Sequence, residues 1–177
     1  MQRCVLMSIR AEIARTILNT WTKQIEYRSR FGDFRGRVYV YASGKEGGKI
    51  TGFFDVNNVI TTKRHKALNA EEWDLLERLD QKNHEQFFLA KNSNEKMNML
   101  FIENPHRFKQ PLTLDDFGKA TGAAIACAPQ SWQYITVNEG FEPESVEVAP
   151  SYGSNDFGTD DDPTDEFLKE HKDECRQ

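Results

Sequence analysis

Lysine, glutamate and arginine side chains gather between Thr22 and Arg37, in the stretch TKQIEYRSRFGDFRGR. Arginine offers a planar fork of donors and lysine a mobile point charge, so beside a carboxylate they suit a hydrogen-bonding or anionic ligand such as a nucleotide. If the stretch is extended, Glu26 and Arg28 share one face with Gln24, and Lys23 lies on the opposite face. The alternative interpretation is a solvated basic loop, because charge runs usually mark exposed surface.

The elements on either side must position this stretch. The run from Cys4 to Ile9 is almost continuously apolar, which is typical of a buried central strand. Apolar residues at steps of three and four predict a helix from Ala11 to Trp21. After the basic stretch, the alternation from Val38 to Ala42 predicts a strand with Tyr39 and Tyr41 on one face.

The remaining periodic segments predict further strands and short helices. A turn from Ser43 to Gly48 leads into a long strand from Lys49 to Ile60, which we expect to be bulged at Gly52. Helix caps are expected at Asn69, with Glu72 in capping-box position, and at Thr113, with Asp116 at the third position. Met97 to Ile102 reads as a strand, and Pro105 and Pro111 then bracket the residues RFKQ.

The charge divides the chain of 177 residues into two parts. Residues 1–137 carry 20 Lys and Arg against 15 Asp and Glu, whereas residues 138–177 carry 3 against 13, so a body of net +5 is followed by a tail of net −10. We therefore predict one domain over residues 1–137 and a largely disordered acidic tail over residues 138–177. The tail either competes with nucleic acid for the basic body or only aids solubility.

Cysteine, histidine and hydropathy patterns exclude several other classes of protein. The three cysteines form no CxxC pair and are odd in number, which favours a reducing cytoplasm. The four histidines are scattered without helical spacing, so we expect no metal site and no cofactor. No apolar run is long enough for a membrane span or a signal peptide.

Read in order, six segments closely resemble the ASCH domain family of the PUA-like superfamily. They are VLMSIR, the following helix, TKQIEYR, VYVYAS, GKITGFFDV and APQSWQYI, and together they cover about Val5 to Ile135. The resemblance implies an α+β fold: a small mixed β-barrel with flanking helices and a cleft associated with RNA or modified-nucleobase recognition.

The resemblance also assigns candidate ligand-binding residues, motif by motif. Ser8 and Arg10 match the family's Ser-Ile-Lys opening, and Lys23, Glu26 and Arg28 match its Lys-x-x-Glu-x-Arg segment, with one extra residue before it. The later strand and the closing motif contribute Tyr41, Ser43, Gln130, Ser131 and Trp132. The resemblance implies that the barrel brings the first and last motifs together. We therefore expect Lys23 and Glu26 to face one cleft, with Ser8 or Arg10 and residues 130–134 on its walls. Each candidate residue has a plainer interpretation as well, since Tyr41 and Trp132 could be core aromatics and the polar side chains could bond local backbone.

Three functions agree with these assignments. The first is a module that binds RNA or a modified base or nucleoside, with the arginines and Lys23 on phosphate or carbonyl groups. The second is a hydrolase that resembles the family's N4-acetylcytidine amidohydrolases and would use Lys23 and Glu26 as catalytic residues. Glu26 stands where those enzymes have a threonine, so Thr20 or Thr22 would supply the nucleophile or Glu26 would direct water. The third is a single-strand ribonuclease, an activity known within the family.

Overall fold

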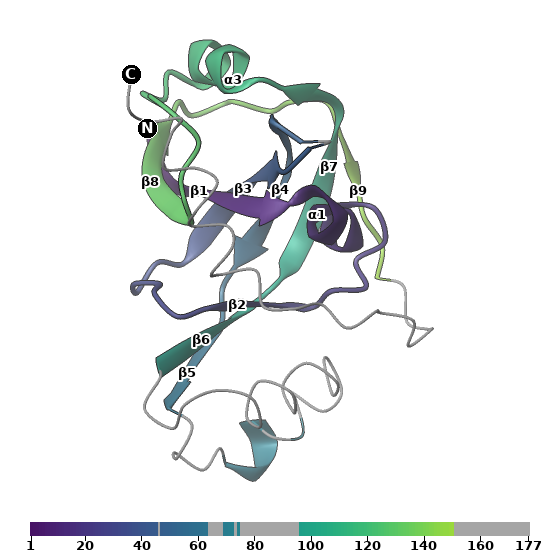
Figure 1. Cartoon of the computed structure of the whole chain (residues 1–177), viewed down its shortest axis with the longest axis vertical. Helices are drawn as coiled ribbons and strands as arrows, with labels where there is room; N and C mark the ends of the chain where they lie inside the picture. The colour runs from purple at the N-terminus through teal and green to yellow at the C-terminus, as the bar shows by residue number, and fades with distance from the viewer. Residues whose placement is uncertain (46, 64–68, 73, 75–95, 151–177) are drawn as a thin grey trace.

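The chain folds around two β-sheets, which Figure 1 shows one above the other. The structure is a computed structural model that describes residues 1–45, 47–63, 69–72, 74 and 96–150. Within these residues the larger sheet has the order β8 (Trp132–Val137), β1 (Gln2–Arg10), β3 (Gly36–Ser43), β4 (Lys49–Val56), β7 (Glu103–Leu112) and β9 (Ser145–Glu147). The smaller sheet has the order β2 (Ile25–Arg28), β6 (Lys96–Phe101) and β5 (Val59–Lys63).

The larger sheet is mixed. β1 and β3 run parallel because the chain crosses from one to the other through the helix α1 (Ala11–Leu18) and β2, and every other pair in the described sheets is antiparallel. β4 continues into β5 and β6 into β7, so the two sheets share continuous chain and enclose a core between them. The expected α+β fold, a mixed β-barrel with flanking helices, is confirmed.

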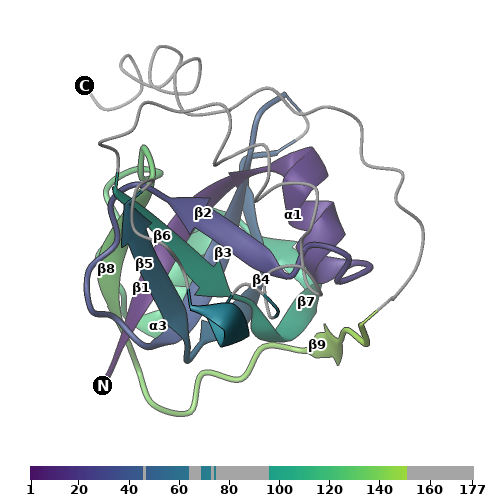
Figure 2. The same cartoon turned by 90° about the horizontal axis from the view of Figure 1, so that it is seen from below.

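Both faces of the larger sheet are buried, which explains the unbroken apolar run in β1. Val5, Met7 and Ile9 point into a first core, which α1 and the smaller sheet cover. Cys4 and Leu6 point into a second core, which the helix α3 (Leu114–Thr121) covers on the other side. Figure 2 shows the smaller sheet and α1 together in front of the larger sheet, with α3 behind it.

The end of α1 turns the chain into β2. The helix ends at Leu18 rather than at Trp21, because Asn19 and Thr20 interrupt it and Trp21 adopts a positive φ of 45°. The carbonyl of Thr16 accepts hydrogen bonds from the backbone N–H groups of Thr22 (2.8 Å) and Lys23 (3.1 Å). These bonds fix the segment that carries Lys23 against the C-terminal end of α1.

Gly52 marks the predicted bulge. The register of β3 on β4 shifts there, with Val40 opposite Gly52 and Tyr41 opposite Ile50. A Cβ at Gly52 would collide with the carbonyl oxygen of His106 on β7. Glycine therefore lets β7 approach β4 closely, and the predicted irregularity is confirmed.

The predicted helix caps are also confirmed. The backbone N–H of Glu72 donates to Asn69 Oδ1 (2.8 Å), and the N–H of Asn69 donates back to the Glu72 carboxylate (3.2 Å). Thr113 Oγ1 accepts from the N–H of Asp116 (3.1 Å) at the start of α3. Both arrangements satisfy N–H groups that the first turn of a helix cannot bond internally.

The packed part of the chain continues past the expected boundary at residue 137. β9 pairs with β7, Phe141 packs against the second core, and Val148 is only 7% exposed. Apolar residues set among the glutamates of this segment explain the difference, because they bury against the sheet while the carboxylates stay in water. The expected disorder of the tail, and its contact with the body, concern residues 151–177, which lie outside the described residues.

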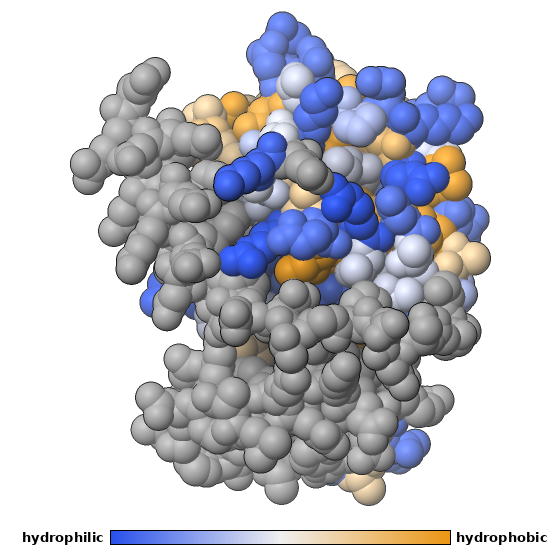
Figure 3. All heavy atoms as spheres, turned by 45° about the vertical axis from the view of Figure 1, so that its right-hand side comes forward, coloured by the Kyte–Doolittle hydropathy of each residue, from blue (hydrophilic) through white to orange (hydrophobic). Residues whose placement is uncertain are grey.

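The surface of the described part is mostly polar on the face shown in Figure 3, where hydrophobic residues form only small separate groups. No helix in the described ranges is both long and apolar enough to cross a membrane.

Candidate functional site

Glu26 lies at the centre of a cluster of charged side chains. It sits on β2 opposite Leu100 of β6 and is only 8% exposed. Its Oε1 accepts a hydrogen bond from Arg28 Nε at 3.0 Å, which agrees with the prediction that residues 26 and 28 share a face. A buried carboxylate costs several kcal/mol unless charges and donors compensate it, so this pairing is required for β2 to pack.

Lys23 completes the cluster. Its Nζ lies 3.7 Å from Glu26 Oε2 and 5.6 Å from the centroid of the Tyr27 ring. This contact agrees with the expectation that Lys23 and Glu26 face one site, whereas alternation along an extended strand would put them on opposite faces. β2 begins only at Ile25, and Lys23 belongs to the turn after α1. Strand alternation therefore does not apply to Lys23, and its long side chain reaches the carboxylate.

Arg28 joins the smaller sheet to the larger one. Its Nη1 donates to Ser131 Oγ and its Nη2 to the backbone carbonyl of Ser8, each at 3.0 Å. Ser8 in turn donates its hydroxyl to the carbonyl of Pro129 (2.6 Å), and its N–H bonds the carbonyl of Ser131 (2.9 Å). An unbroken path of polar contacts thus runs from Lys23 through Glu26 and Arg28 to Ser131.

The first and last motifs of the sequence therefore meet at this cluster. Five candidate residues are brought together: Ser8, Lys23, Glu26, Arg28 and Ser131. We call these five residues the Glu26 cluster. It carries two cations and one carboxylate, so its net charge is positive.

The other candidates lie around the cluster without joining it. Among the described residues, no hydrogen bond links Arg10, Ser43 or Gln130 to the Glu26 cluster. Arg10 and Ser43 are register partners at the ends of β1 and β3, and Gln130 is exposed.

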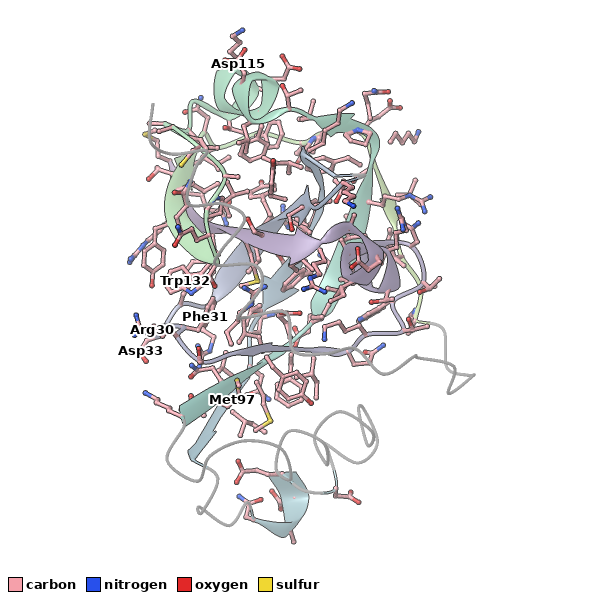
Figure 4. All side chains as sticks on the ribbon, viewed as in Figure 1. Arg30, Phe31, Asp33, Met97, Asp115 and Trp132 are labelled. Carbon is pink, nitrogen blue, oxygen red and sulfur yellow. The ribbon has the colours of Figure 1, made fainter. Side chains whose placement is uncertain are left out.

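Two aromatic candidates pack against other parts of the protein. Tyr41 is buried in the second core, in register with Ser8. Trp132 donates its Nε1 hydrogen to the carbonyl of Arg30 (2.7 Å), and its ring lies edge-on to Phe31 at a centroid distance of 5.3 Å. Figure 4 shows Trp132 and Phe31 beside each other, with Arg30 and Asp33 at the outside of the molecule.

Several buried polar atoms beside these elements have no hydrogen-bond partner within the described residues. They are Glu26 Oε2, which has only the lysine at 3.7 Å, the hydroxyl of Ser43, which is 1% exposed, the Nε1 of Trp21 and the Oγ1 of Thr51. Buried polar atoms are normally bonded, so an unpartnered acceptor beside two cations is a feature that a ligand or water would satisfy. The buried position of Trp21 Nε1 was not predictable from the sequence, because it depends on the turn after α1.

The threonines that could act as nucleophiles are bonded elsewhere. The hydroxyls of Thr20 and Thr22 lie 3.1 Å apart, and both contact the carbonyl of Thr16, at 3.5 Å and 3.3 Å. No hydrogen bond in the described part joins either hydroxyl to Lys23 or Glu26. A nucleophile must lie within hydrogen-bond reach of its base, and in this arrangement neither threonine does.

A second ion pair joins the start of β3 to β4. Arg37 Nε donates to Asp55 Oδ1 at 3.0 Å, and this bond raises the pKa of the guanidinium although burial opposes it. Burial also raises the pKa of the nearby Cys4 thiol to about 11 and that of Tyr39 to about 12. Within the described residues, no three His, Cys, Asp or Glu side chains gather as metal ligands.

Two cavities open on other parts of the surface. One, of about 410 Å³, is lined by residues of β5 and by Glu71 and Glu72. The other, of about 390 Å³, is lined by Arg3, Tyr134 and neighbouring residues of β8 and by the segment after α3. Neither cavity includes the Glu26 cluster, in which Ser8 and Glu26 are buried and Lys23 and Arg28 are partly exposed.

Comparison with solved structures identifies the fold. The crystal structure of the ASCH protein from Zymomonas mobilis is similar to this chain with a TM-score of 0.52 and 18% identity over 74% of this chain and 86% of that one. A tyrosine-to-phenylalanine mutant of that protein gives a TM-score of 0.53 at 16% identity, over 75% and 90% of the two chains. A serine-to-alanine mutant gives 0.52 at 16%, over 74% and 87%. No family model and no curated protein matches the sequence, so the likeness is one of fold.

Proposed function

We propose that this chain, which has the ASCH-domain fold, binds RNA or a modified nucleobase or nucleoside at the Glu26 cluster. The observation that carries the proposal is the carboxylate oxygen Glu26 Oε2, which is buried, lacks a hydrogen-bond partner among the described residues and lies beside the cations Lys23 and Arg28. A nucleobase presents N–H donors next to carbonyl acceptors on one edge. The cluster offers the complementary acceptor and donors.

The basic charge of the N-terminal segment that carries Lys23 and Arg28 supports the same ligand class. Eight Lys and Arg residues precede Val38, against three Asp and Glu. Lys23 and Arg28 can exchange part of their contact with Glu26 for contact with a phosphate or carbonyl oxygen, because both have several N–H donors. Gln130 is exposed next to Ser131 and would add an amide at the rim.

A hydrolase is the second candidate, and one contact favours it. The approach of Lys23 to Glu26 places a possible acid and a possible base together, as hydrolysis of an acetylated cytidine or of RNA requires. The bonds of Thr20 and Thr22 to the end of α1 support binding over a threonine nucleophile. In a hydrolase of this geometry, Glu26 would direct water.

The binding experiment compares the purified protein with two site variants. We expect the wild type to bind a fluorescein-labelled oligouridine or cytidine, and we expect Lys23→Ala and Glu26→Gln to weaken binding at least about tenfold, as loss of a charge-assisted hydrogen bond does. Asp55→Asn is the matched control, because it removes a carboxylate paired with arginine outside the cluster. Equal affinities for Lys23→Ala, Glu26→Gln and the wild type would reject the site.

The enzymatic alternative is tested with the same proteins. The wild type and Lys23→Ala are incubated with N4-acetylcytidine and with single-stranded RNA, and products are separated by chromatography. Release of cytidine and acetate, or cleavage of RNA, that disappears in Lys23→Ala would favour the hydrolase. Binding without any product favours the binding module. A cytoplasmic location, where RNA and its nucleosides occur, belongs to the same proposal.

A further inference from the structure

Arg3 and Tyr134 form a stacked pair on the surface of the larger sheet. The guanidinium carbon of Arg3 lies 3.7 Å above the centroid of the Tyr134 ring. Tyr134 is 41% exposed, more than any other Phe, Tyr or Trp among the described residues. Arg3 is exposed as well. In the described ranges no hydrogen bond occupies the Arg3 guanidinium, so its N–H edges are available to a ligand.

The tyrosine ring is held in place from three sides. It meets Trp132 edge-on at a centroid distance of 5.1 Å and Phe34 at 5.9 Å. Its hydroxyl lies beside Gly32, where a Cβ would come within 3.1 Å of it. A ring already fixed in this way loses little conformational entropy when a ligand stacks on it.

A cavity opens directly at this pair. Its volume is about 390 Å³, and its lining includes Arg3, Gly122, Ala124, Tyr134 and Thr136. This volume lies within the range of about 300–1,000 Å³ that is typical of small-ligand sites. The lining combines an aromatic ring, a guanidinium, a hydroxyl and backbone.

The cavity and the Glu26 cluster lie at two points along β8. Ser131, which bonds Arg28, directly precedes β8, and Tyr134 follows three residues later, roughly 10 Å along the strand. The loop that packs on Trp132 carries two exposed arginines, Arg30 and Arg35, and one acidic residue, Asp33. The part of β8 between the cluster and the cavity therefore carries the ring of Trp132 and lies beside a loop of net positive charge.

We propose that the Arg3–Tyr134 pair is a second contact site for a single-stranded nucleic acid whose neighbouring nucleotide occupies the Glu26 cluster. This inference rests on the proposed function and specifies its ligand as a polymer rather than a free nucleoside. An unpaired base stacks in the cavity against the Arg3–Tyr134 pair, and the guanidinium edge of Arg3 contacts a phosphate. Duplex RNA does not fit, because its bases are already stacked on one another.

The experiment measures two ligands against four variants. Affinity for a short labelled oligouridine is measured by fluorescence anisotropy, and affinity for cytidine by calorimetry. Tyr134→Ala and Arg3→Ala are expected to weaken oligouridine binding about tenfold, in line with the contribution of one stacked base. Both should leave cytidine binding unchanged. Tyr134→Phe keeps the ring and should bind as the wild type does, and Lys109→Ala, which removes an exposed lysine paired with Glu144, controls for charge.

Each other outcome overturns the inference in a recognisable way. If wild-type protein binds oligouridine and the Arg3 and Tyr134 variants bind it equally well, the second contact site is wrong while the proposed function stands. If cytidine binding falls as much as oligouridine binding, the variants act on the Glu26 cluster or the fold, and a separate site is excluded. If a duplex of the same length binds as tightly as the single strand, stacking is refuted. If wild-type protein binds neither ligand, the proposed function fails together with the inference.

Discussion

Replacement of Arg28 by lysine should destabilise the protein, although it keeps the positive charge. The Arg28 guanidinium donates three hydrogen bonds at 3.0 Å, to Glu26, to Ser131 and to the Ser8 carbonyl. A lysine ammonium lacks the planar fork and can keep the bond to Glu26 but not all three. The perturbation therefore removes the direct link between the two sheets.

The size of the effect follows from which groups are left unbonded. Ser131 is exposed, so water replaces its bond at little cost, whereas the Ser8 carbonyl is in a buried residue. An unsatisfied buried acceptor costs about 1–3 kcal/mol, and poorer geometry at Glu26 adds about 1 kcal/mol, so we expect a loss of about 2–3 kcal/mol in the free energy of unfolding. Urea denaturation followed by tryptophan fluorescence measures this loss.

Arg37→Lys is the matched control for this prediction. Arg37 donates to Asp55 through Nε at 3.0 Å and Nη2 at 3.4 Å, its guanidinium carbon lies 3.8 Å above the centroid of the Phe53 ring, and these contacts stay within the larger sheet. Arg37→Lys should therefore lower the free energy of unfolding by about 1 kcal/mol or less. If Arg28→Lys costs no more than Arg37→Lys, the guanidinium does not join the sheets as described. A further check is that Ser131→Ala should add nothing in the Arg28→Lys background.

Four further predictions concern backbone packing, pH, salt and the tail. Gly52→Ala should cost about 1–3 kcal/mol, because its Cβ meets the His106 carbonyl, whereas Gly32→Ala should cost less; equal urea midpoints would contradict this. Because burial raises the pKa of Cys4 from 9.0 to about 11 and that of Tyr39 from 10.0 to about 12, stability should be complete below pH 9 and fall as the pH rises toward 12. Tyr39→Phe should flatten part of that fall in the urea midpoint, and a wild-type midpoint that stays constant over this range would exclude it. The logarithm of the affinity for single-stranded RNA should fall against the logarithm of salt concentration with a slope of about −0.7 per phosphate contact, and a flat line would indicate an uncharged ligand. Truncation after Val148 should tighten RNA binding in dilute buffer and change it little at high salt, whereas equal affinities in dilute buffer would exclude competition by the tail.

The local patterns of the sequence were sufficient for much of the fold. The apolar run in β1 indicated a strand buried on both faces, and the caps at Asn69 and Thr113 lay at the predicted residues. These features depend on neighbouring residues, whose periodicity and side-chain chemistry are visible in the sequence. The meeting of Ser8 with Ser131 was inferred from the resemblance to the ASCH family, since no local pattern relates residues so far apart.

Other elements could not be predicted because tertiary contacts decide them. β7 contains Pro105 and Pro111, and no sequence pattern predicted it as a strand, yet it pairs with β4 across irregular register and with β9 at its outer edge. The predicted strand from Lys49 to Ile60 divides into β4 and β5 at two asparagines, so that one run of sequence serves both sheets. β9 is short and lies among glutamates, and it forms a strand because it pairs with the edge strand β7.

The candidate site also combines features that local sequence patterns predict with features that tertiary contacts decide. Alternation along β2 placed Glu26 and Arg28 together. The family resemblance placed Lys23 at the same site, whereas strand alternation alone would put it on the other face, because the turn at Trp21 is not visible in the sequence. The stacking of Arg3 on Tyr134 depends on the register of β1 with β8, in which Val5 lies opposite Tyr134. Such a register is set by the whole sheet, so sequence reasoning had no means of finding this pair.

A crystal structure of the protein with a bound nucleoside tests the central claim most directly. Crystals soaked with cytidine, or with N4-acetylcytidine, should show the base with an N–H group within hydrogen-bond distance of Glu26 Oε2 and a carbonyl oxygen facing Lys23 or Arg28. Ser131 should lie on the opposite side of the same ligand. A nucleoside bound away from these residues, with the contacts of Lys23 and Arg28 to Glu26 unchanged, would contradict the assignment of the site.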